Sequence, residues 1–161
     1  MVFADLTLRP ARDEDAAILI DLVGGCFAPY PGCELDLDFM DASLKAIASY
    51  VGERNGEIWL VFDGDQLVGS GGYIQERPDR IELIKLYVRD SHRRRGLASA
   101  LLNKVRQVAE RKGLGMDLWT DTRFVEAHHF YTRHGFIQQP EIRSFDDPSK
   151  TSEYQFILAQ D

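Results

Sequence analysis

Apolar and polar positions change their spacing several times along the chain, and each change marks a predicted element. Loose alternation from Phe3 to Arg9 predicts a first strand, which Pro10 would end. A run of acids after Arg12 then leads into apolar residues spaced by three or four positions, as at the start of a helix. We expect this helix to stop at Gly24-Gly25.

The next segments combine one predicted helix with three predicted strands. Asp36 to Tyr50 has helical spacing, whereas Ile58 to Phe62 and Leu67 to Ile74 are short apolar runs. The Asp-Gly pair between those two runs is a strong hairpin signal. A third run, Ile81 to Val88, is apolar on both faces, so we expect the three strands to form an antiparallel meander.

A long amphipathic helix follows the meander. Its apolar stripe begins at Leu97, and Gly113 lies just past its end as a C-terminal cap. Met116 to Thr120 predicts another strand. Because strand, helix and strand connect in a right-handed crossover, this strand should lie parallel to Ile81–Val88.

The last part of the chain predicts one more helix and two strands. The helix runs from Val125 to Arg133 and is closed by Gly135. Phe136–Ile137 and Glu153–Leu158 read as strands that flank a polar loop. The predicted class is α+β: a single domain of residues 1–161 with a mixed, mostly antiparallel sheet and flanking helices.

Composition and charge narrow the partners. The net charge of -7 argues against non-specific nucleic-acid binding, and no apolar run is long enough to span a membrane. There is no visible secretory signal, and Cys26 and Cys33 are too few for a disulfide framework, so we expect a cytoplasmic protein. His128 and His129 are adjacent and would point apart on a helix, so we expect no metal site.

A basic loop between a strand and a helix is the first candidate site. Arg93, Arg94 and Arg95 precede Gly96 and Ala98, whose small side chains would let an anion approach the backbone. The first amides of a helix have no partner within it and carry partial positive charge, which favours phosphate. Taken alone, the three arginines also fit a solvated turn.

Two further positions have candidate chemistry. Glu82 lies in an apolar strand, where burial would raise its pKa and make it a plausible general base. The alternative is an ordinary charge that points to water or pairs with Arg80 or Lys85. Phe130 and Tyr131 have a spacing that is typical of core aromatics. Adjacent helical residues point about 100° apart, however, so if Phe130 faces the core, Tyr131 would turn toward a cleft with its hydroxyl available as an acid.

These residues resemble a known family. Glu82–Val88, followed by Arg93-x-x-Gly96-x-Ala98, resembles the central motif of the GNAT acetyltransferases. Ala127–Phe136 resembles their second hallmark, in which alanine is followed by a hydrophobic residue, tyrosine and a Gly-Phe pair. The order of the predicted elements also matches this family across nearly the whole chain.

The resemblance implies the GNAT fold, with a splayed pair of parallel strands, and acetyl-CoA as cosubstrate without a metal. It implies direct attack by an amine in a ternary complex, with Glu82 as general base and Tyr131 as the acid that protonates the departing thiolate. The amide of Leu86 would hold the thioester carbonyl. The residues implied in binding acetyl-CoA are Leu86, Tyr87, Val88, Arg93, Arg94, Arg95, Gly96, Leu97 and Ala98.

The acceptor side is less defined. Many members of the family have asparagine where this chain has Phe124, so the pantetheine contact of that asparagine is missing here. The segments that form the acceptor pocket in the family here supply Tyr30, Glu34 and Tyr73, with acids at Asp36, Asp38 and Asp147. The acids favour a small cationic amine as the acceptor.

Two other functions remain open at this point. One is a non-catalytic module that binds acyl-CoA and regulates a partner, although Glu82 and Tyr131 argue against it. The other is an acetyltransferase that acts on protein lysines or N-termini, which would need a shallow acceptor groove. A homodimer is a further expectation that rests on the resemblance alone.

Overall fold

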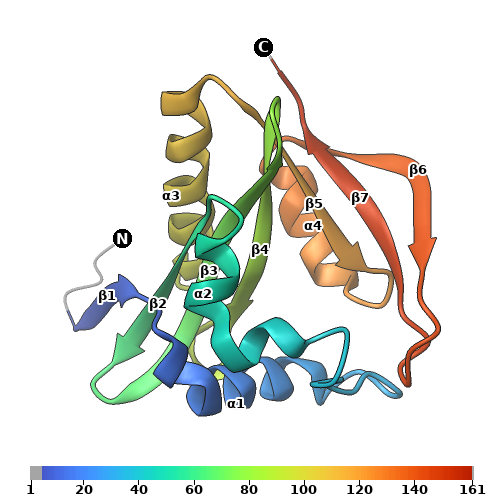
Figure 1. The fold of residues 1–161 in the computed structure, drawn as a ribbon. Helices are drawn as coiled ribbons and strands as arrows, with labels where there is room; N and C mark the ends of the chain where they lie inside the picture. The colour runs from blue at the N-terminus through green and yellow to red at the C-terminus, as the bar shows by residue number, and fades with distance from the viewer. Residues whose placement is uncertain (1–4, 161) are drawn as a thin grey trace.

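The structure is a computed structural model that describes residues 5–160, and its framework is a seven-stranded sheet (Figure 1). The strand order is β1-β2-β3-β4-β5-β7-β6, and β4 and β5 are the parallel neighbours in an otherwise antiparallel sheet. The strands are β1 (Leu6–Pro10), β2 (Glu57–Asp63), β3 (Gln66–Arg77), β4 (Arg80–Val88), β5 (Gly115–Asp121), β6 (Phe136–Ser144) and β7 (Ser152–Leu158).

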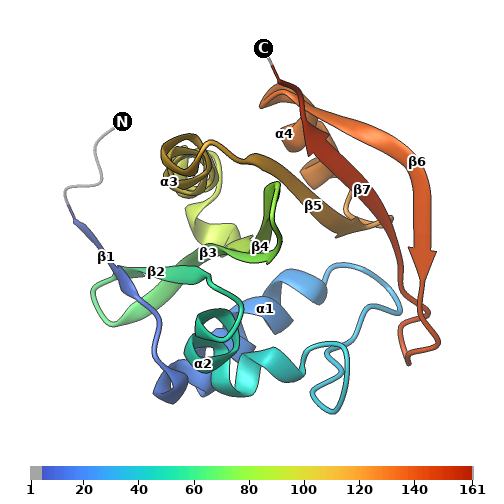
Figure 2. The ribbon, with the colours of Figure 1, turned by 45° about the horizontal axis from the view of Figure 1, so that its top comes forward.

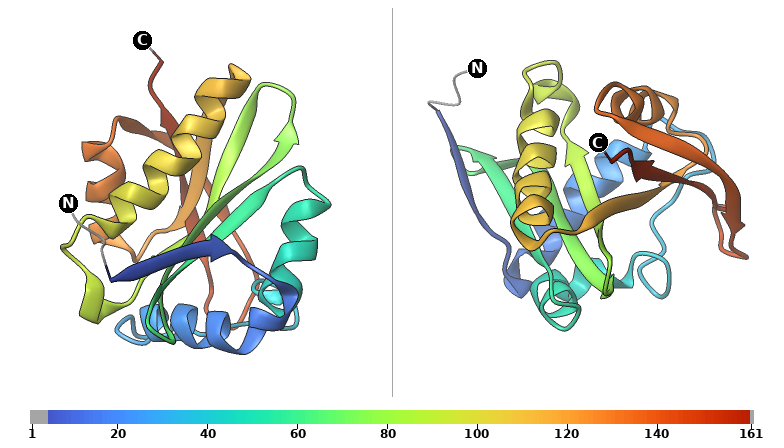
Figure 3. Two further views of the ribbon diagram at one scale, coloured as in Figure 1. Left: turned by 90° about the vertical axis from the view of Figure 1, so that its left-hand side faces the viewer. Right: turned by 90° about the horizontal axis from the view of Figure 1, so that it is seen from above.

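Helices cover both faces of this sheet (Figures 2 and 3). Side chains alternate across each strand, so Leu60 packs with α1 and α2 whereas its neighbour Val61 packs with α3. Tyr131 of α4 belongs to the core cluster on the α3 side. The helices are α1 (Ala16–Phe27), α2 (Ile47–Gly52), α3 (Leu97–Lys112) and α4 (Val125–Arg133). In the described residues no helix is long and apolar enough to cross a membrane.

The structure confirms the predicted fold class and most of its elements. β2, β3 and β4 form the expected antiparallel meander, with the Asp-Gly turn between β2 and β3. The crossover through α3 makes β5 parallel to β4. Gly113 caps α3 with a left-handed φ of 67°, as the pattern predicts.

Two boundary predictions are wrong, and one is confirmed. α1 continues through Gly24-Gly25 to Phe27, because burial of Cys26 offsets the low helix propensity of glycine. β1 ends at Pro10, as predicted, and as an edge strand it tolerates the missing amide of this residue. β6 extends to Ser144, well past the predicted Ile137. The predicted start of the first strand at Phe3 lies outside the described residues.

The predicted helix from Asp36 to Tyr50 is also wrong over most of its length. Asp36 accepts a hydrogen bond from the amide of Met40, and Asp41 accepts one from the amide of Asp36. Aspartate side chains that bond to nearby backbone amides compete with helix formation. A 3-10 turn therefore spans Ala42–Ala46, and the α-helix begins only at Ile47.

A β-bulge at Lys85 changes the course of β4. Ser70 pairs with Tyr87 and Gly72 pairs with Ile84, so β4 has one residue more than β3 across this interval. Lys85 is left-handed, with a φ of 53°, which costs a non-glycine residue about 1–2 kcal/mol. The buried hydroxyl of Ser70 donates a 2.6 Å hydrogen bond to the Lys85 carbonyl and so holds the bulge in place.

β4 and β5 separate before this bulge. Their register contains three pairs, the last of which joins Glu82 to Asp117. Beyond Glu82 the two strands diverge, and β5 continues in register with β7 instead. This is the splayed parallel pair that the family resemblance implies, and it opens a wedge within the sheet.

The meander is packed so tightly that one added methyl group should lower the stability of the protein. A Cβ on Gly72 would lie 2.3 Å from the Glu57 carbonyl oxygen and 2.7 Å from Cα of Ile58, both of which belong to the sheet. We expect Gly72→Ala to lower the free energy of unfolding by about 1–3 kcal/mol. Gly52→Ala is the control, because a Cβ there meets nothing within 4 Å and should stabilise α2 by a few tenths to about 1 kcal/mol.

Urea unfolding followed by circular dichroism measures both changes. Equal stability of the two variants would show that the backbone of β2 and β3 relaxes around the added carbon.

Candidate active site

The wedge between β4 and β5 is a cavity of about 910 Å³. One wall is formed by the diverging half of β4, residues 83–88, and the other by residues 118–121 of β5. At one end lie the loop after β4 and the first turn of α3; we call this the phosphate end. The opposite end, which we call the acceptor end, is lined by Met40, Asp41, Tyr50, Glu82, Lys85, Arg143 and Glu153.

The phosphate end combines a folded loop with a helix N-terminus. Arg94 and Gly96 are both left-handed, with φ values of 63° and 79°, and this conformation turns the loop into α3. The first hydrogen bond of α3 runs from the amide of Ala100 to the carbonyl of Gly96. The amides of Leu97 and Ala98 precede it and so have no carbonyl partner within the helix. Together with the macrodipole, these amides suit the approach of an anion to the helix end.

The three arginines of this loop take different positions. Arg93 folds inward, where its Nε donates a 3.0 Å hydrogen bond to the Val88 carbonyl and its guanidinium lies 3.7 Å from Cys26 Sγ. It therefore braces the loop against the end of β4. Arg94 also lines the cavity, whereas Arg95 is not among the cavity-lining residues of the described chain.

Glu82 lies half-buried at the last paired position of β4 and lines the cavity. Burial raises its pKa to about 7, and the negative charge of nearby Asp117 adds to the effect. Arg80 pairs with Asp79 at 3.3 Å and Asp117 at 3.9 Å rather than with Glu82. A carboxyl group that titrates near neutrality suits a general base.

Tyr131 lies at the other side of the wedge, on α4. It is only 7% exposed, and its ring packs against Phe130, Phe136 and Phe156. Burial raises the pKa of its phenol well above the usual value, so the hydroxyl keeps its proton at neutral pH. Both Tyr131 and Phe130 line the cavity, and the tyrosine is the more buried of the two, which reverses the predicted arrangement.

The predicted acceptor residues separate into two groups. Tyr30 and Glu34 line the cavity. Tyr73 does not: it is buried in the core beside Trp59 and donates a 3.0 Å hydrogen bond to Glu57. Tyr73 faces the α3 side of β3, away from α1 and α2, so its predicted place at the acceptor is not what the structure shows.

Phe124 contributes an aromatic wall where the family often has asparagine. Its ring centroid lies 4.8 Å from that of Tyr30 and 5.7 Å from that of Phe27. Phe27 in turn lies edge-on to Tyr87 of β4. All four rings line the cavity, so an apolar surface replaces an amide at this point.

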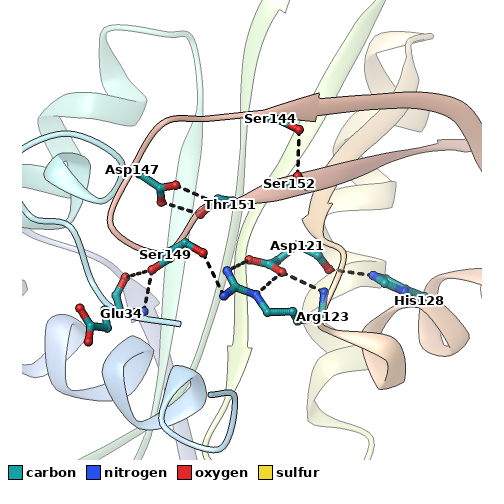
Figure 4. Close-up of polar contacts among 9 residues, drawn as sticks. All are labelled: Glu34, Asp121, Arg123, His128, Ser144, Asp147, Ser149, Thr151 and Ser152. Carbon is teal, nitrogen blue, oxygen red and sulfur yellow. Dashed lines mark hydrogen bonds and ion pairs between the residues drawn. The ribbon is translucent and has the colours of Figure 1, made fainter. Parts of the chain in front are cut away.

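Hydrogen bonds between Ser149 and Glu34, which we call the clasp, join the loop between β6 and β7 to the loop after α1 (Figure 4). Ser149 Oγ donates to the Glu34 carbonyl at 3.0 Å and accepts from the Glu34 amide at 2.8 Å. Arg123 bridges from the Ser149 carbonyl to the carboxylate of Asp121. The carboxylate of Asp147 accepts hydrogen bonds from both the amide and the hydroxyl of Thr151, so it stabilises the conformation of its own loop.

Several residues of the acceptor end have no signal in the sequence. Arg143 Nε donates a 2.7 Å hydrogen bond to Glu153, and its guanidinium lies 4.3 Å from the centroid of the Trp119 ring. Asp41 and Lys85 also line this end. These side chains come from separate elements, and charged residues like them are common on any protein surface. Only the folding of the chain brings them together. Among the described residues no cluster of His, Cys, Asp and Glu could hold a metal ion.

A cavity between diverging parallel strands, with an anion site at the helix that connects them, is the architecture of a GNAT-type acyltransferase. A model described as the acetyltransferase (GNAT) family matches residues 19–136. The chain therefore belongs to the GNAT acetyltransferase family.

Relatives and solved structures agree with this assignment. The chain is 32% identical over 81 residues to the uncharacterized N-acetyltransferase YedL of Escherichia coli (strain K12), which covers 48% of this chain and 51% of that protein. It spans about half the length, or less, of the curated relatives it matches.

Among solved structures, an acetyltransferase from Streptococcus agalactiae 2603 has the same fold with a TM-score of 0.79, at 18% identity over 97% of this chain and 100% of the other. The protein yncA of Salmonella typhimurium, solved with its cofactor acetyl-CoA, has a TM-score of 0.69 at 15% identity, over 98% of this chain and 95% of the other.

The phosphate end can be tested with two glycines of α3. Gly96→Glu adds bulk and negative charge at the loop, and we expect it to weaken acetyl-CoA binding by at least about 100-fold. Gly113→Glu is the matched control at the other end of α3, because it imposes the same change at a similar left-handed φ.

Isothermal titration with acetyl-CoA should show near-normal affinity for Gly113→Glu. Equal losses in the two variants would indicate that backbone strain, rather than the anion site, explains the effect.

Proposed function

We propose that this protein transfers the acetyl group of acetyl-CoA to a primary amine by direct attack in a ternary complex. The supporting observation is that one cavity contains an anion site, a carboxyl group and a phenol. The pKa of the carboxyl group is raised to about 7, which suits a base, and the pKa of the phenol is raised, so that it keeps its proton. The anion site fits the phosphates of coenzyme A, at residues 93–98. The divergence of β4 and β5 leaves the edge of residues 83–88 unpaired by β5, where an extended pantetheine arm fits.

The backbone of the bulge supplies the electrostatic part of the mechanism. The bulge at Lys85 offsets the amides that follow it, and the amide of Leu86 is the donor we assign to the thioester oxygen. A donor aimed at the oxygen that becomes negative stabilises the tetrahedral intermediate more than the ground state.

Two side chains handle the protons. Glu82 accepts a proton from the acceptor ammonium, directly or through water, and the free amine then attacks the thioester carbon. A carbon–nitrogen bond forms, the carbon–sulfur bond breaks, and Tyr131 gives its proton to the departing thiolate. The new amide nitrogen passes its extra proton through water to the Tyr131 phenolate, and Glu82 releases its proton to solvent. The products are an N-acetylated amine and coenzyme A, with Cys26 and Cys33 uninvolved.

A small acceptor fits this cavity better than a folded protein does. The clasp between Glu34 and Ser149 joins the loop after α1 to the loop between β6 and β7, and both loops contribute residues to the cavity wall. Thiol release from acetyl-CoA with a panel of small amines is the direct assay. Thermal stabilisation by acetyl-CoA without thiol release from any amine would instead support a regulatory module that binds acyl-CoA.

Removal of the Tyr131 hydroxyl tests the general acid. Tyr131→Phe preserves the aromatic packing with Phe130, Phe136 and Phe156, so folding and acetyl-CoA affinity should stay near wild type. We expect kcat to fall about 100-fold or more, because the thiolate loses its proton donor. Stopped assays of thiol release and titration with acetyl-CoA measure the two quantities, and full activity would exclude Tyr131 as the acid.

The pH profile tests the general base. Only ionised Glu82 accepts a proton, so kcat/KM should rise as pH increases through about 7, the raised pKa of this group. Glu82→Gln should lower kcat/KM by at least about 100-fold and remove that rise, which leaves the dependence on the acceptor's own ionisation.

Glu110→Gln, on the exposed side of α3, makes the same substitution away from the cavity and serves as the control. A rise near pH 7 that persists in Glu82→Gln would assign the base to another group.

A further inference from the structure

Lys85 is a cation in the acceptor end that the proposed mechanism does not use. It lines the cavity from the bulge of β4, three positions after Glu82. In the described part of the chain no hydrogen bond or ion pair reaches its ammonium group from another residue. Burial lowers the pKa of this ammonium group, so the surrounding protein does not fully compensate its charge.

The acids near Lys85 have other hydrogen-bond partners or another proposed role. Asp41, Glu153 and Glu82 are the carboxyl groups whose charges act on it. Glu153 accepts a 2.7 Å hydrogen bond from Arg143, and Asp41 accepts a 2.8 Å hydrogen bond from the amide of Asp36. Glu82 is the base in the proposed function. None of the three lies within 4.0 Å of the Lys85 ammonium in an ion pair, although all are near enough to act on its charge.

The bulge explains why this lysine points into the cavity. A lysine in a regular strand could turn toward solvent, whereas Lys85 is held in a left-handed conformation by the Ser70 hydroxyl. Backbone strain of this kind persists only where the surrounding structure enforces it, and it is common at ligand sites. The same bulge therefore fixes the position of the Lys85 side chain relative to Glu82.

The sequence prediction of a cationic acceptor weakens for the same reason. Of the acids on which it relied, Asp36 and Asp38 are not among the described residues that line the cavity. Asp147 lines the cavity, but its carboxylate bonds to Thr151 of its own loop. Glu34 remains at the cavity wall. An acceptor end that contains a base and an unpaired ammonium suits a ligand that carries both an amine and an anion.

We infer that the acceptor is a small amino acid, whose carboxylate binds the Lys85 ammonium while its amine faces Glu82. The inference rests on the proposed acetyl transfer and narrows its substrate class. A carboxylate beside Lys85 gives this cavity-lining ammonium a partner of opposite charge, and a charge-assisted hydrogen bond of this kind is among the stronger polar contacts. The products are then an N-acetyl amino acid and coenzyme A.

The test compares amines that differ in the carboxylate. Thiol release from acetyl-CoA is measured with L-phenylalanine, L-methionine and L-lysine, each beside its carboxamide and its decarboxylated amine. For at least one of the three amino acids, we expect wild-type kcat/KM to exceed that of both uncharged counterparts by about 10-fold or more. Since the contact is present before and during the reaction, Lys85→Met should remove this preference mainly through KM.

Two variants control for charge and fold. Lys85→Arg keeps a cation on the bulge and should retain part of the preference. Lys45→Met loses the same charge from an exposed position outside the cavity, so it should keep the wild-type preference. Acetyl-CoA affinity, measured for every variant, shows that each one is folded.

Two results would overturn the inference while leaving acetyl transfer intact. One is a wild-type preference for the carboxamides or plain amines. The other is an equal loss of kcat/KM for all acceptors in Lys85→Met, which would assign Lys85 to the chemistry or the fold instead of to a carboxylate. Absence of thiol release from every amine would overturn the proposed function itself, and this inference with it.

Discussion

The loss of pairing between β4 and β5 is the constraint on which the site depends. Two parallel strands that stayed in register would bury their backbone groups against each other and leave no room between them. Here the register ends at Glu82 and Asp117, and β7 takes over the free edge of β5. The sheet therefore remains continuous from β1 to β6 while it opens in the middle. The cavity is thus a feature of the strand topology and not of a flexible surface loop.

Burial at this opening also sets the chemistry of the side chains. Glu82 and Tyr131 belong to different elements, yet both have raised pKa values because the walls around them exclude water. For a carboxyl group the shift brings ionisation close to neutrality, whereas for a phenol it secures the proton. One physical cause therefore acts on both groups, in the directions that the proposed base and the proposed acid require.

The sequence predicted what depends on local pattern and missed what depends on distant pairing. The 3.6-residue period and the glycine at position 113 were enough to define α3, and the Asp-Gly turn defined the β2–β3 hairpin. The predicted helix from Asp36 to Tyr50 was wrong because the carboxylates of Asp36 and Asp41 accept hydrogen bonds from nearby backbone amides. Hydrophobic spacing carries no information about such bonds. The bulge had no signal, since Lys85 is not a residue that favours a positive φ. Glu153 and Arg143 enter the site only through the pairing of β5, β6 and β7.

The clasp between Glu34 and Ser149 has a consequence for how the protein is made. It joins residues 115 positions apart, and β5 acquires its second neighbour only when β7 is present. Contacts of such separation form late, because the entropy of closing a long loop must be overcome first. During synthesis the phosphate loop and α3 emerge well before Ser149, so a nascent chain can fold one half of the active site while the other half does not yet exist. Assembly of the cavity is therefore coupled to completion of the C-terminal hairpin.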